Sequence, residues 1–334
     1  MKFPRSEYLS NRFTTRNRFF AKRHQQPSRS SDHRLRERFR RALVESLEER
    51  CMMDATSGSQ ERLVNSLIPR LQSSDQQSTA LAVNSQGNSV VVYAGYRDDD
   101  PDGVFHRRFP SGGSASAVEL VNVERRQEQS SPSVAIGENN QYAICWQGRG
   151  RDESQGLRDS NGVFMRWFSP DGQSLTGEVL VNQQTEGVQE NADLTILPDG
   201  TAVIVWAGAS REDASGVYAR RFSSLGTPLS PQVLLHQPDS VRNDYPSVSS
   251  DASGNVFVTW SRRTGGNSAW DILVRKFDSQ LNPLSAVQVI GSGPDRPELA
   301  GTQVRSRIAT VSDGSSILTW TGQDVARNQW NIYA

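Results

Sequence analysis

The chain has 334 residues, of which 35% are hydrophobic, and its 37 Lys and Arg balance 37 Asp and Glu. Residues 1–50 hold 14 Lys and Arg against 6 Asp and Glu, whereas the remainder holds 23 against 31. An acidic body behind a basic tail excludes nucleic acid as a partner of the body on charge grounds. The two cysteines and four histidines form no disulfide framework or metal-ligand spacing, and no run of 18 apolar residues predicts a transmembrane span.

The basic tail divides into two parts by composition. Residues 1–33 are rich in Arg, Ser and Gln and lack lasting periodicity, which predicts disorder. From residue 34 to residue 53, apolar side chains recur every four residues, at Leu35, Phe39, Leu43 and Leu47. This spacing predicts one apolar face of a basic amphipathic helix, which on composition alone would suit a membrane surface.

The end of this helix also carries a short motif. Residues 44–55 read Val-Glu-Ser-Leu-Glu-Glu-Arg-Cys-Met-Met-Asp-Ala, and they resemble the amino-terminal export segment of planctomycete surface and secreted proteins. The matching positions are Leu47, Glu48, Arg50, Met52, Met53 and Ala55, with the two methionines in place of the commoner Leu pair. The resemblance implies export to the cell envelope or medium, with the tail removed near Ala55. We therefore expect an export segment over residues 1–55 and a folded domain over residues 56–334.

The folded domain is organised as repeats. An apolar run ends in an aromatic residue five times, at Tyr93, Trp146, Trp206, Trp260 and Trp320. A second run follows four of them and ends in Phe109, Phe168, Phe222 and Phe277. Self-similarity at a period of roughly 50 residues indicates a repeat architecture. The repeats begin near Ser78, Ser131, Asn191, Tyr245 and Arg305.

Each repeat contains four short runs with the character of strands. In the third repeat these are Asp193–Leu197, Thr201–Trp206, Gly216–Phe222 and Gln232–His236, separated by polar turns such as Asp199-Gly200. The second run is apolar throughout, which predicts a strand covered on both faces. Four antiparallel strands per repeat predict an all-β protein, a propeller of about five four-stranded blades.

The last repeat ends inside its third strand, at Ala334. The segment Glu61–Asn65 precedes the first repeat and resembles the fourth strands Val118–Asn122 and Glu178–Asn182. Because a propeller must hide its edge strands, we predict that this segment completes the last blade and closes a five-bladed ring. The alternative is a longer propeller of which this chain is a part.

The repeats also resemble a bacterial secreted repeat family. Its unit has Asp-Gly, an apolar run to Trp, a polar loop, Val-Tyr-Ala-x-Arg-Phe, a Gly turn and Glu-x-x-Val-Asn. The best matches are Asp199–Phe222 and Gly162–Asn182, and the resemblance covers about residues 61–334. It implies an extracellular location and an architecture rather than an activity.

The loops between second and third strands are the long ones, and they are acidic. Function concentrates on loops that a rigid scaffold holds, so we look for a site at this end of the blades. Clustered carboxylates suit Ca²⁺, and the best candidates are Asp98, Asp100 and Asp102. The alternative is a solvated loop whose carboxylates pair with arginine.

The tryptophans divide into two groups. Those at the ends of second strands are expected to pack in the core. Trp167 and Trp270 break the repeat pattern. Trp270 lies beside Asp271 near a loop, so we predict Trp270 and Asp271 as ligand contacts.

Three functions are compatible with these features. The first is an exported binding or adhesion module without catalytic activity, whose partner is a surface glycan or protein. The second is a glycan-acting hydrolase, which requires two carboxyl groups at about 5–10 Å. The third is a purely structural repeat unit of a larger envelope assembly. No nucleotide, protease or lipase motif appears in the sequence.

Overall fold

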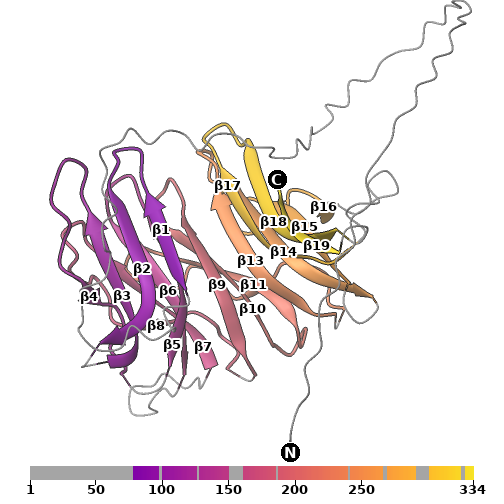
Figure 1. Cartoon of the computed structure of the whole chain (residues 1–334), viewed down its shortest axis with the longest axis horizontal. Helices are drawn as coiled ribbons and strands as arrows, with labels where there is room; N and C mark the ends of the chain where they lie inside the picture. Colours follow the sequence, from indigo (N-terminus) through magenta and orange to yellow (C-terminus); the bar gives the residue numbers. More distant parts are fainter. Residues whose placement is uncertain are drawn as a thin grey trace, which may run out of the picture. The chain divides into compact units, whose positions relative to one another are not determined.

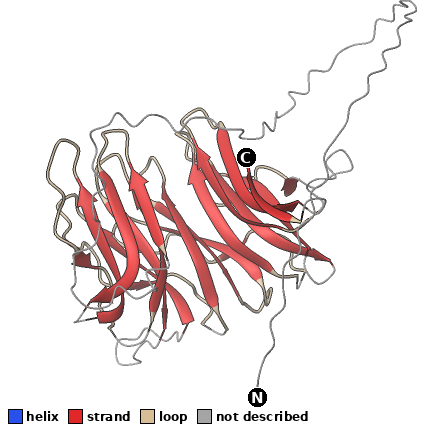
Figure 2. Ribbon diagram, viewed as in Figure 1, coloured by secondary structure: helices blue, strands red, loops and turns tan. Residues whose placement is uncertain are grey.

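The computed structural model describes most of the repeat region. The described ranges are 78–97, 100–125, 128–149, 161–185, 187–239, 241–265, 269–290, 301–324 and 328–334. All regular structure in these ranges is β-strand (Figure 2). None of these residues belongs to a helix long and apolar enough to cross a membrane.

The strands form five separate antiparallel sheets, which we call the first to fifth blades (Figure 1). The first blade contains β1 (Thr79–Val83), β2 (Ser89–Arg97), β3 (Asp100–Phe109) and β4 (Glu119–Leu120). The second contains β5 (Gln129–Ile136), β6 (Tyr142–Arg149), β7 (Asn161–Phe168) and β8 (Val179–Leu180). The third contains β9 (Gln189–Ile196), β10 (Ala202–Gly208), β11 (Gly216–Phe222) and β12 (Val233–Leu234). The fourth contains β13 (Asn243–Ser250), β14 (Val256–Gly265), β15 (Ala269–Phe277) and β16 (Gln288–Ile290). The fifth contains β17 (Gln303–Thr310), β18 (Ser316–Asp324) and β19 (Gln329–Tyr333).

The prediction of an all-β propeller with five repeats is confirmed. The first strands of successive blades pack side by side, β1 on β5, β5 on β9, β9 on β13 and β13 on β17. In the described ranges, no comparable packing joins β17 to β1. The fifth blade has three described strands. Residues 61–65 lie outside the described residues, so completion of this blade by them stays a prediction.

The core lies between the blades, and the second strands supply most of it. Along β10, Ile204 and Trp206 pack toward the second blade, whereas Val203 and Val205 pack toward the fourth. All four side chains are fully buried. A strand that alternates its side chains between two apolar neighbours needs apolar residues at every position, as the sequence predicted.

The aromatic residues that end the apolar runs of the second strands are core residues. Trp146, Trp206 and Trp260 are fully buried, and Trp320 is nearly so. In three blades the indole N–H donates to an amide oxygen 17 residues earlier in the first strand: Trp146 to Gln129, Trp206 to Gln189 and Trp260 to Asn243, at 3.0–3.1 Å. This bond satisfies the one polar atom of a buried tryptophan and ties the first strand to the second.

A β-bulge interrupts the first strand of four blades. One residue at each bulge has a positive φ between 50° and 58°: Ser131, Asn191, Tyr245 and Arg305. These are also the positions at which the repeats were predicted to begin. Each of the four lines the central channel, whose volume is about 850 Å³. The bulge therefore turns one side chain per blade toward the channel.

A repeated arginine joins neighbouring blades. Its Nη1 donates to a backbone carbonyl just after the fourth strand of the preceding blade: Arg166 to Val121, Arg220 to Val181 and Arg275 to Leu235, at 2.7–2.9 Å. Its Nε donates within its own blade, as from Arg166 to the Thr176 carbonyl at 3.2 Å. One side chain thus satisfies carbonyls on two blades.

Replacing Arg166 by alanine is expected to lower the free energy of unfolding by about 2–3 kcal/mol. The variant loses charge-assisted hydrogen bonds and leaves the partly buried Val121 carbonyl without this donor. Urea denaturation measures the change. The matched control is Arg211→Ala in the β10–β11 loop, because Arg211 is exposed and its loss should cost less than about 0.5 kcal/mol. Equal losses in the two variants would contradict the role of Arg166 as a clamp between blades.

Candidate active site

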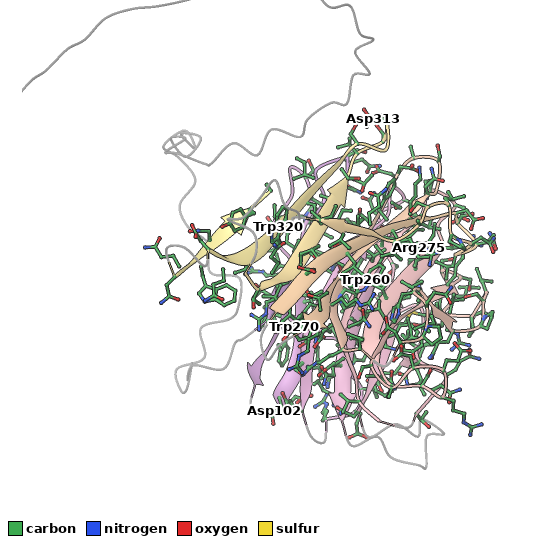
Figure 3. The ribbon with its side chains drawn as sticks, turned by 90° about the vertical axis from the view of Figure 1, so that its right-hand side faces the viewer. Asp102, Trp260, Trp270, Arg275, Asp313 and Trp320 are labelled. Atoms are coloured by element: carbon green, nitrogen blue, oxygen red, sulfur yellow. The ribbon has the colours of Figure 1, made fainter. Side chains whose placement is uncertain are left out.

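The two ends of the blades differ. Asp313 lies in the tight turn between β17 and β18, whereas Trp270 and Asp102 lie toward the opposite end of the sheets (Figure 3). The bulges of the first strands lie toward the same end as Trp270, since the strand that contains Tyr245 runs from there toward the tight turns. The channel mouth with the bulged side chains therefore opens at the long-loop end.

Asp193 lines the central channel and contacts side chains of the neighbouring blades. Its oxygens accept hydrogen bonds from Ser133 Oγ of the second blade at 2.6 Å and from Ser247 Oγ of the fourth blade at 2.9 Å. Arg307 Nη1 of the fifth blade lies 3.7 Å away. Asp193 therefore connects four blades, and its oxygens are committed to this network.

A groove of about 370 Å³ opens beside the channel, between the fourth and fifth blades. It is lined by Arg242, Tyr245, Trp270, Val304, Arg305, Thr321 and Trp330. Two of these, Tyr245 and Arg305, also line the channel, so the groove and the channel are continuous. Three aromatic rings in one exposed groove are typical of surfaces that bind flat apolar faces.

Cations cover two of the rings. The guanidinium carbon of Arg242 lies 5.7 Å from the centre of the Trp270 ring, and that of Arg305 lies 5.1 Å from the Tyr245 ring. The Trp330 side chain is 55% exposed. The groove thus offers one open aromatic face beside two rings that are already stacked with arginine.

Arg242 also brings two carboxylates together. Its Nη2 lies 2.8 Å from Asp244 Oδ2 and 3.9 Å from Glu190 Oε1. The two carboxylate oxygens are therefore no further apart than these two distances combined. This limit is compatible with the separations of roughly 5–9.5 Å that pairs of catalytic carboxyl groups have in glycosidases.

The two carboxylates have different surroundings. Asp244 is buried, and it accepts hydrogen bonds at 2.8 Å from Asn191 Nδ2 and the Tyr245 backbone N–H as well as from Arg242. The Glu190 side chain is 35% exposed. The hydrogen bond that Arg242 donates to Asp244 raises the pKa of the Arg242 guanidinium, with burial acting in the opposite direction. Arg242 therefore stays charged between a fixed carboxylate and a solvent-accessible one.

Two of the four bulge residues with positive φ lie in the groove. Tyr245 and Arg305 have φ values of 51° and 58°, in the left-handed region that bulky residues rarely adopt. Such conformations cost on the order of 1 kcal/mol or more and are often found at functional sites. Here the strain directs a tyrosine and an arginine into the groove.

The predicted ligand contacts are only partly brought together. Trp270 lines the groove, whereas Asp271 is not among the residues that line it. Successive side chains of a strand point to opposite faces of the sheet, which explains the separation of the two. Ligand binding by either residue stays a prediction.

The predicted calcium ligands are likewise divided. Asp98 lies outside the described residues, and Asp102 is exposed. Asp100 is fully buried, and its two oxygens accept hydrogen bonds from the Asp102 backbone N–H at 3.2 Å and from Asn122 Nδ2 at 2.7 Å. The described contacts of Asp100 are those of a hairpin cap, and calcium binding stays a prediction.

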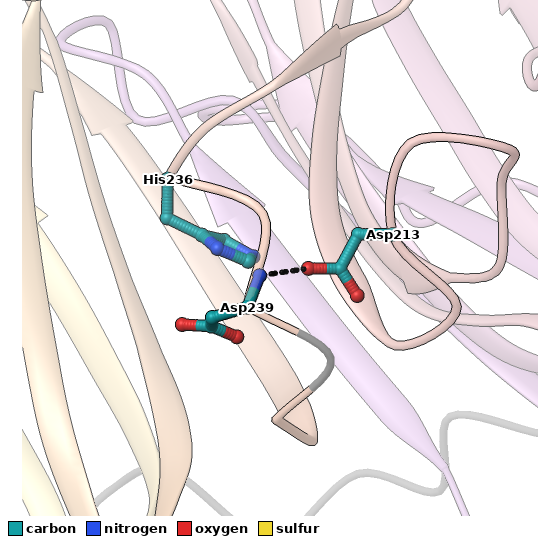
Figure 4. Close-up of side chains that lie close together, drawn as sticks. All are labelled: Asp213, His236 and Asp239. Atoms are coloured by element: carbon teal, nitrogen blue, oxygen red, sulfur yellow. Dashed lines mark hydrogen bonds between the residues drawn. The ribbon is translucent and has the colours of Figure 1, made fainter.

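A second group with metal-like composition contains Asp213, His236 and Asp239 (Figure 4). His236 Nε2 accepts the Val217 backbone N–H at 3.2 Å, and Nδ1 lies 2.8 Å from the Gln237 carbonyl oxygen. This pattern assigns the proton to Nδ1 and occupies both ring nitrogens. His236 therefore offers no free lone pair to a metal, and we assign it a structural role.

The neighbouring blades support that role. Asn122 and Asn182 occupy the place of His236 in the first two blades, and their Oδ1 atoms accept the backbone N–H groups of Val104 and Val163 at 2.8 and 2.9 Å. Histidine and asparagine thus perform the same capping of the third strand.

Sequence reasoning missed Glu190, Arg242 and Asp244. It sought the site in the long loops. Glu190 and Asp244 instead lie in the first strands β9 and β13, beside their bulges, and Arg242 directly precedes β13. The available signal was the polar run at the start of repeats three and four, Gln-Glu-Asn and Asn-Asp-Tyr. The export motif Leu47, Glu48, Arg50, Met52, Met53 and Ala55 lies outside the described residues.

No family model matches the chain, and no curated protein matches it in sequence. Solved structures match it in shape. The endo-arabinase of Bacteroides thetaiotaomicron covers 77% of this chain and 92% of its own, with 10% identity and a TM-score of 0.46. The endo-arabinanase of Bacillus licheniformis covers 77% and 93%, with 12% identity and a TM-score of 0.43. The exo-β-1,3-galactanase of Clostridium thermocellum covers 77% and 57%, with 10% identity and a TM-score of 0.45.

These structures are glycoside hydrolases and not binding modules. These neighbours contradict the expectation of a module without catalytic activity, and the glycan-acting alternative is taken up as a proposal below. Since the TM-scores are below 0.5, the likeness itself carries no argument about substrate or mechanism.

Proposed function

We propose that the protein is a glycan-acting hydrolase and that the groove between the fourth and fifth blades binds its substrate. The observation that carries this proposal is the position of Arg242, which stacks on the Trp270 ring and approaches both Asp244 and Glu190. A carbohydrate offers apolar ring faces to aromatic side chains and hydroxyl groups to charged ones. The groove presents both kinds of contact around Arg242.

The two carboxylates suit different parts of glycosidic hydrolysis. Glycosidases use one carboxyl group that exchanges a proton with the leaving oxygen and a second that acts as base or nucleophile. Glu190 is accessible to solvent and is our candidate for proton transfer. Asp244 is fixed by three donors and is our candidate for the carboxylate that acts as base or nucleophile. Arg242 is hydrogen-bonded to Asp244 and lies 3.9 Å from Glu190, and Trp330 provides the open face on which a sugar ring would stack.

The test is release of reducing sugar from α-L-arabinan and β-1,3-galactan, followed by a wider glycan panel. Glu190→Gln keeps the shape of the side chain and is expected to lower kcat by about 10²–10⁴-fold. Trp330→Ala is expected to raise KM about tenfold, or ~1.4 kcal/mol, and Trp330→Phe should recover part of that loss because it keeps an aromatic face.

The control is Glu212→Gln in the exposed β10–β11 loop, which should leave kcat and KM unchanged. Full activity in Glu190→Gln would remove Glu190 from the mechanism. A wild-type protein that releases sugar from no glycan would contradict the hydrolase proposal.

A further inference from the structure

The groove between the fourth and fifth blades is lined by two charged side chains, and both are arginines. Arg242 already has partners, because it donates to Asp244 at 2.8 Å and lies 3.9 Å from Glu190. Arg305 differs: no described residue forms an ion pair with it or accepts a hydrogen bond from its guanidinium. The groove therefore contains one arginine whose N–H donors remain for a ligand.

Other arginines of the same two blades have carboxylate partners. Arg307 Nη1, two residues further along β17, lies 3.7 Å from Asp193. In the fourth blade, Arg262 Nη2 lies 2.7 Å from Asp239. An unpaired arginine on a flat surface needs only water, but Arg305 lines both the groove and the central channel. A cation in such a concavity is a candidate for binding an anionic group.

The position of Arg305 is fixed in three ways. The β-bulge gives it a φ of 58°, and its backbone N–H donates to Ser261 Oγ at 3.0 Å. Its guanidinium carbon lies 5.1 Å from the centre of the Tyr245 ring. A guanidinium that stacks over a ring keeps its N–H groups available at its edge. The other three residues with positive φ at bulges are neutral, namely Ser131, Asn191 and Tyr245. Among these four described bulges, only that of the fifth blade presents a charged side chain to the channel.

We propose that the glycan bound in this groove carries an anionic group on its sugar rings and that Arg305 binds that group. The inference rests on the proposed function, because it names the class of glycan that the same groove takes. A guanidinium binds a carboxylate through two parallel N–H···O bonds, and a sulfate ester presents similar oxygens. The ligand class is therefore an acidic glycan, of which a uronic acid polymer is the simplest example.

The open aromatic face of the groove supplies the second contact. Trp330 lines the same groove and is 55% exposed. A sugar ring that stacks on Trp330 turns its edge toward the rest of the groove, and the carboxylate of a uronic acid projects from that edge. Because Arg305 is exposed to solvent, salt screens its attraction to the carboxylate. We therefore expect the acidic form of a glycan to bind about tenfold more tightly than its neutral form.

The test is isothermal titration of the full chain with matched trisaccharides. The probes are α-1,4-trigalacturonate and β-1,4-trimannuronate, each compared with its carboxyl-reduced form, which keeps the linkage and loses the charge. Galactotriose sulfated at C6 is the third anionic probe and separates sulfate from carboxylate. At least one anionic probe should bind about tenfold more tightly than its neutral counterpart, and added salt should reduce that difference. Equal binding of acidic and neutral forms, or no binding of any anionic probe, would overturn the inference.

Variants of Arg305 assign the effect to this side chain. Arg305→Gln should raise the dissociation constant of the preferred acidic probe about tenfold and leave that of the neutral form unchanged. Arg305→Lys keeps the charge but loses the planar fork, so its affinity should be intermediate. Arg211→Gln is the matched control, because Arg211 is exposed in the β10–β11 loop of the third blade. Circular dichroism shows that each variant is folded. Equal weakening by Arg305→Gln and Arg211→Gln would overturn the assignment.

Binding and hydrolysis are measured separately, so the two proposals can fail separately. A chain that releases sugar from neutral glycans and shows no preference for acidic ones would leave the hydrolase proposal intact and overturn this inference. A chain that binds an acidic trisaccharide through Arg305 but cleaves no glycan would support the acidic ligand and contradict the hydrolase proposal.

Discussion

Replacing Trp206 by alanine is expected to lower the free energy of unfolding by about 4 kcal/mol. The side chain is fully buried in the cluster between the second and third blades. Its ring stacks with that of Tyr218, with a centroid distance of 6.0 Å. Alanine would leave a cavity and would remove the donor that Gln189 Oε1 accepts at 3.0 Å.

Urea denaturation followed by circular dichroism measures this loss without relying on indole fluorescence. The matched control is Trp330→Ala, because this side chain is 55% exposed and its removal should change stability by less than about 0.5 kcal/mol. Trp206→Tyr should give an intermediate loss, since the first repeat has Tyr93 at this position. If Trp206→Ala and Trp330→Ala destabilised the protein equally, the assignment of the repeat tryptophans to the core would be wrong.

The role of Trp206 illustrates what the sequence can reveal. An apolar run that ends in tryptophan at a regular period predicts a buried strand between two sheets, and β10 is that strand. The third strand was predicted at Gly216–Phe222, where β11 lies. The tight turn at Gly200 was predicted from Asp-Gly, and its φ is 78°. These features depend on local periodicity and turn chemistry, which a single sequence displays.

The first strand illustrates where such reasoning ends. It was predicted to begin at Asp193, whereas β9 extends over Gln189–Ile196. Three of the four additional residues are polar, and a bulge at Asn191 interrupts the alternation that identifies a strand. The equivalent bulges of the fourth and fifth blades place Tyr245 and Arg305 in the groove. Arg242 and Glu190 come from different blades, and only the packing of β9 against β13 brings them together.

His106 is a buried histidine that the proposed activity does not use. It lies on β3 of the first blade and is 1% exposed. Its Nδ1 is 3.2 Å from the Tyr142 hydroxyl, and its ring centre is 4.9 Å from that of Phe168. These neighbours belong to the second blade, so His106 contributes to the interface between the first two blades.

Burial and the neighbouring charges together disfavour protonation of His106. Burial, aided by the positive charges of Arg108 and Arg166, lowers the pKa of His106 from 6.5 to about 3. The carboxylate of Glu119 lies 3.9 Å from Nε2 and acts in the opposite direction, but it is partly exposed. His106 is therefore neutral in the folded protein at any pH above about 3.

The stability of the protein is expected to fall by roughly 3 kcal/mol on this account between pH 6.5 and about pH 4. In that window the unfolded chain binds a proton at His106 and the folded chain does not, so acid favours unfolding. Above pH 6.5 neither state is protonated and the contribution vanishes. His106→Met removes the titrating group and with it this contribution to the unfolding free energy. Methionine suits the site because Met165 fills the equivalent position of the second blade. Unfolding free energies from urea titrations at several pH values should therefore decline less steeply with acid in His106→Met than in the wild-type protein. Parallel declines would show that His106 does not stay neutral in the folded state.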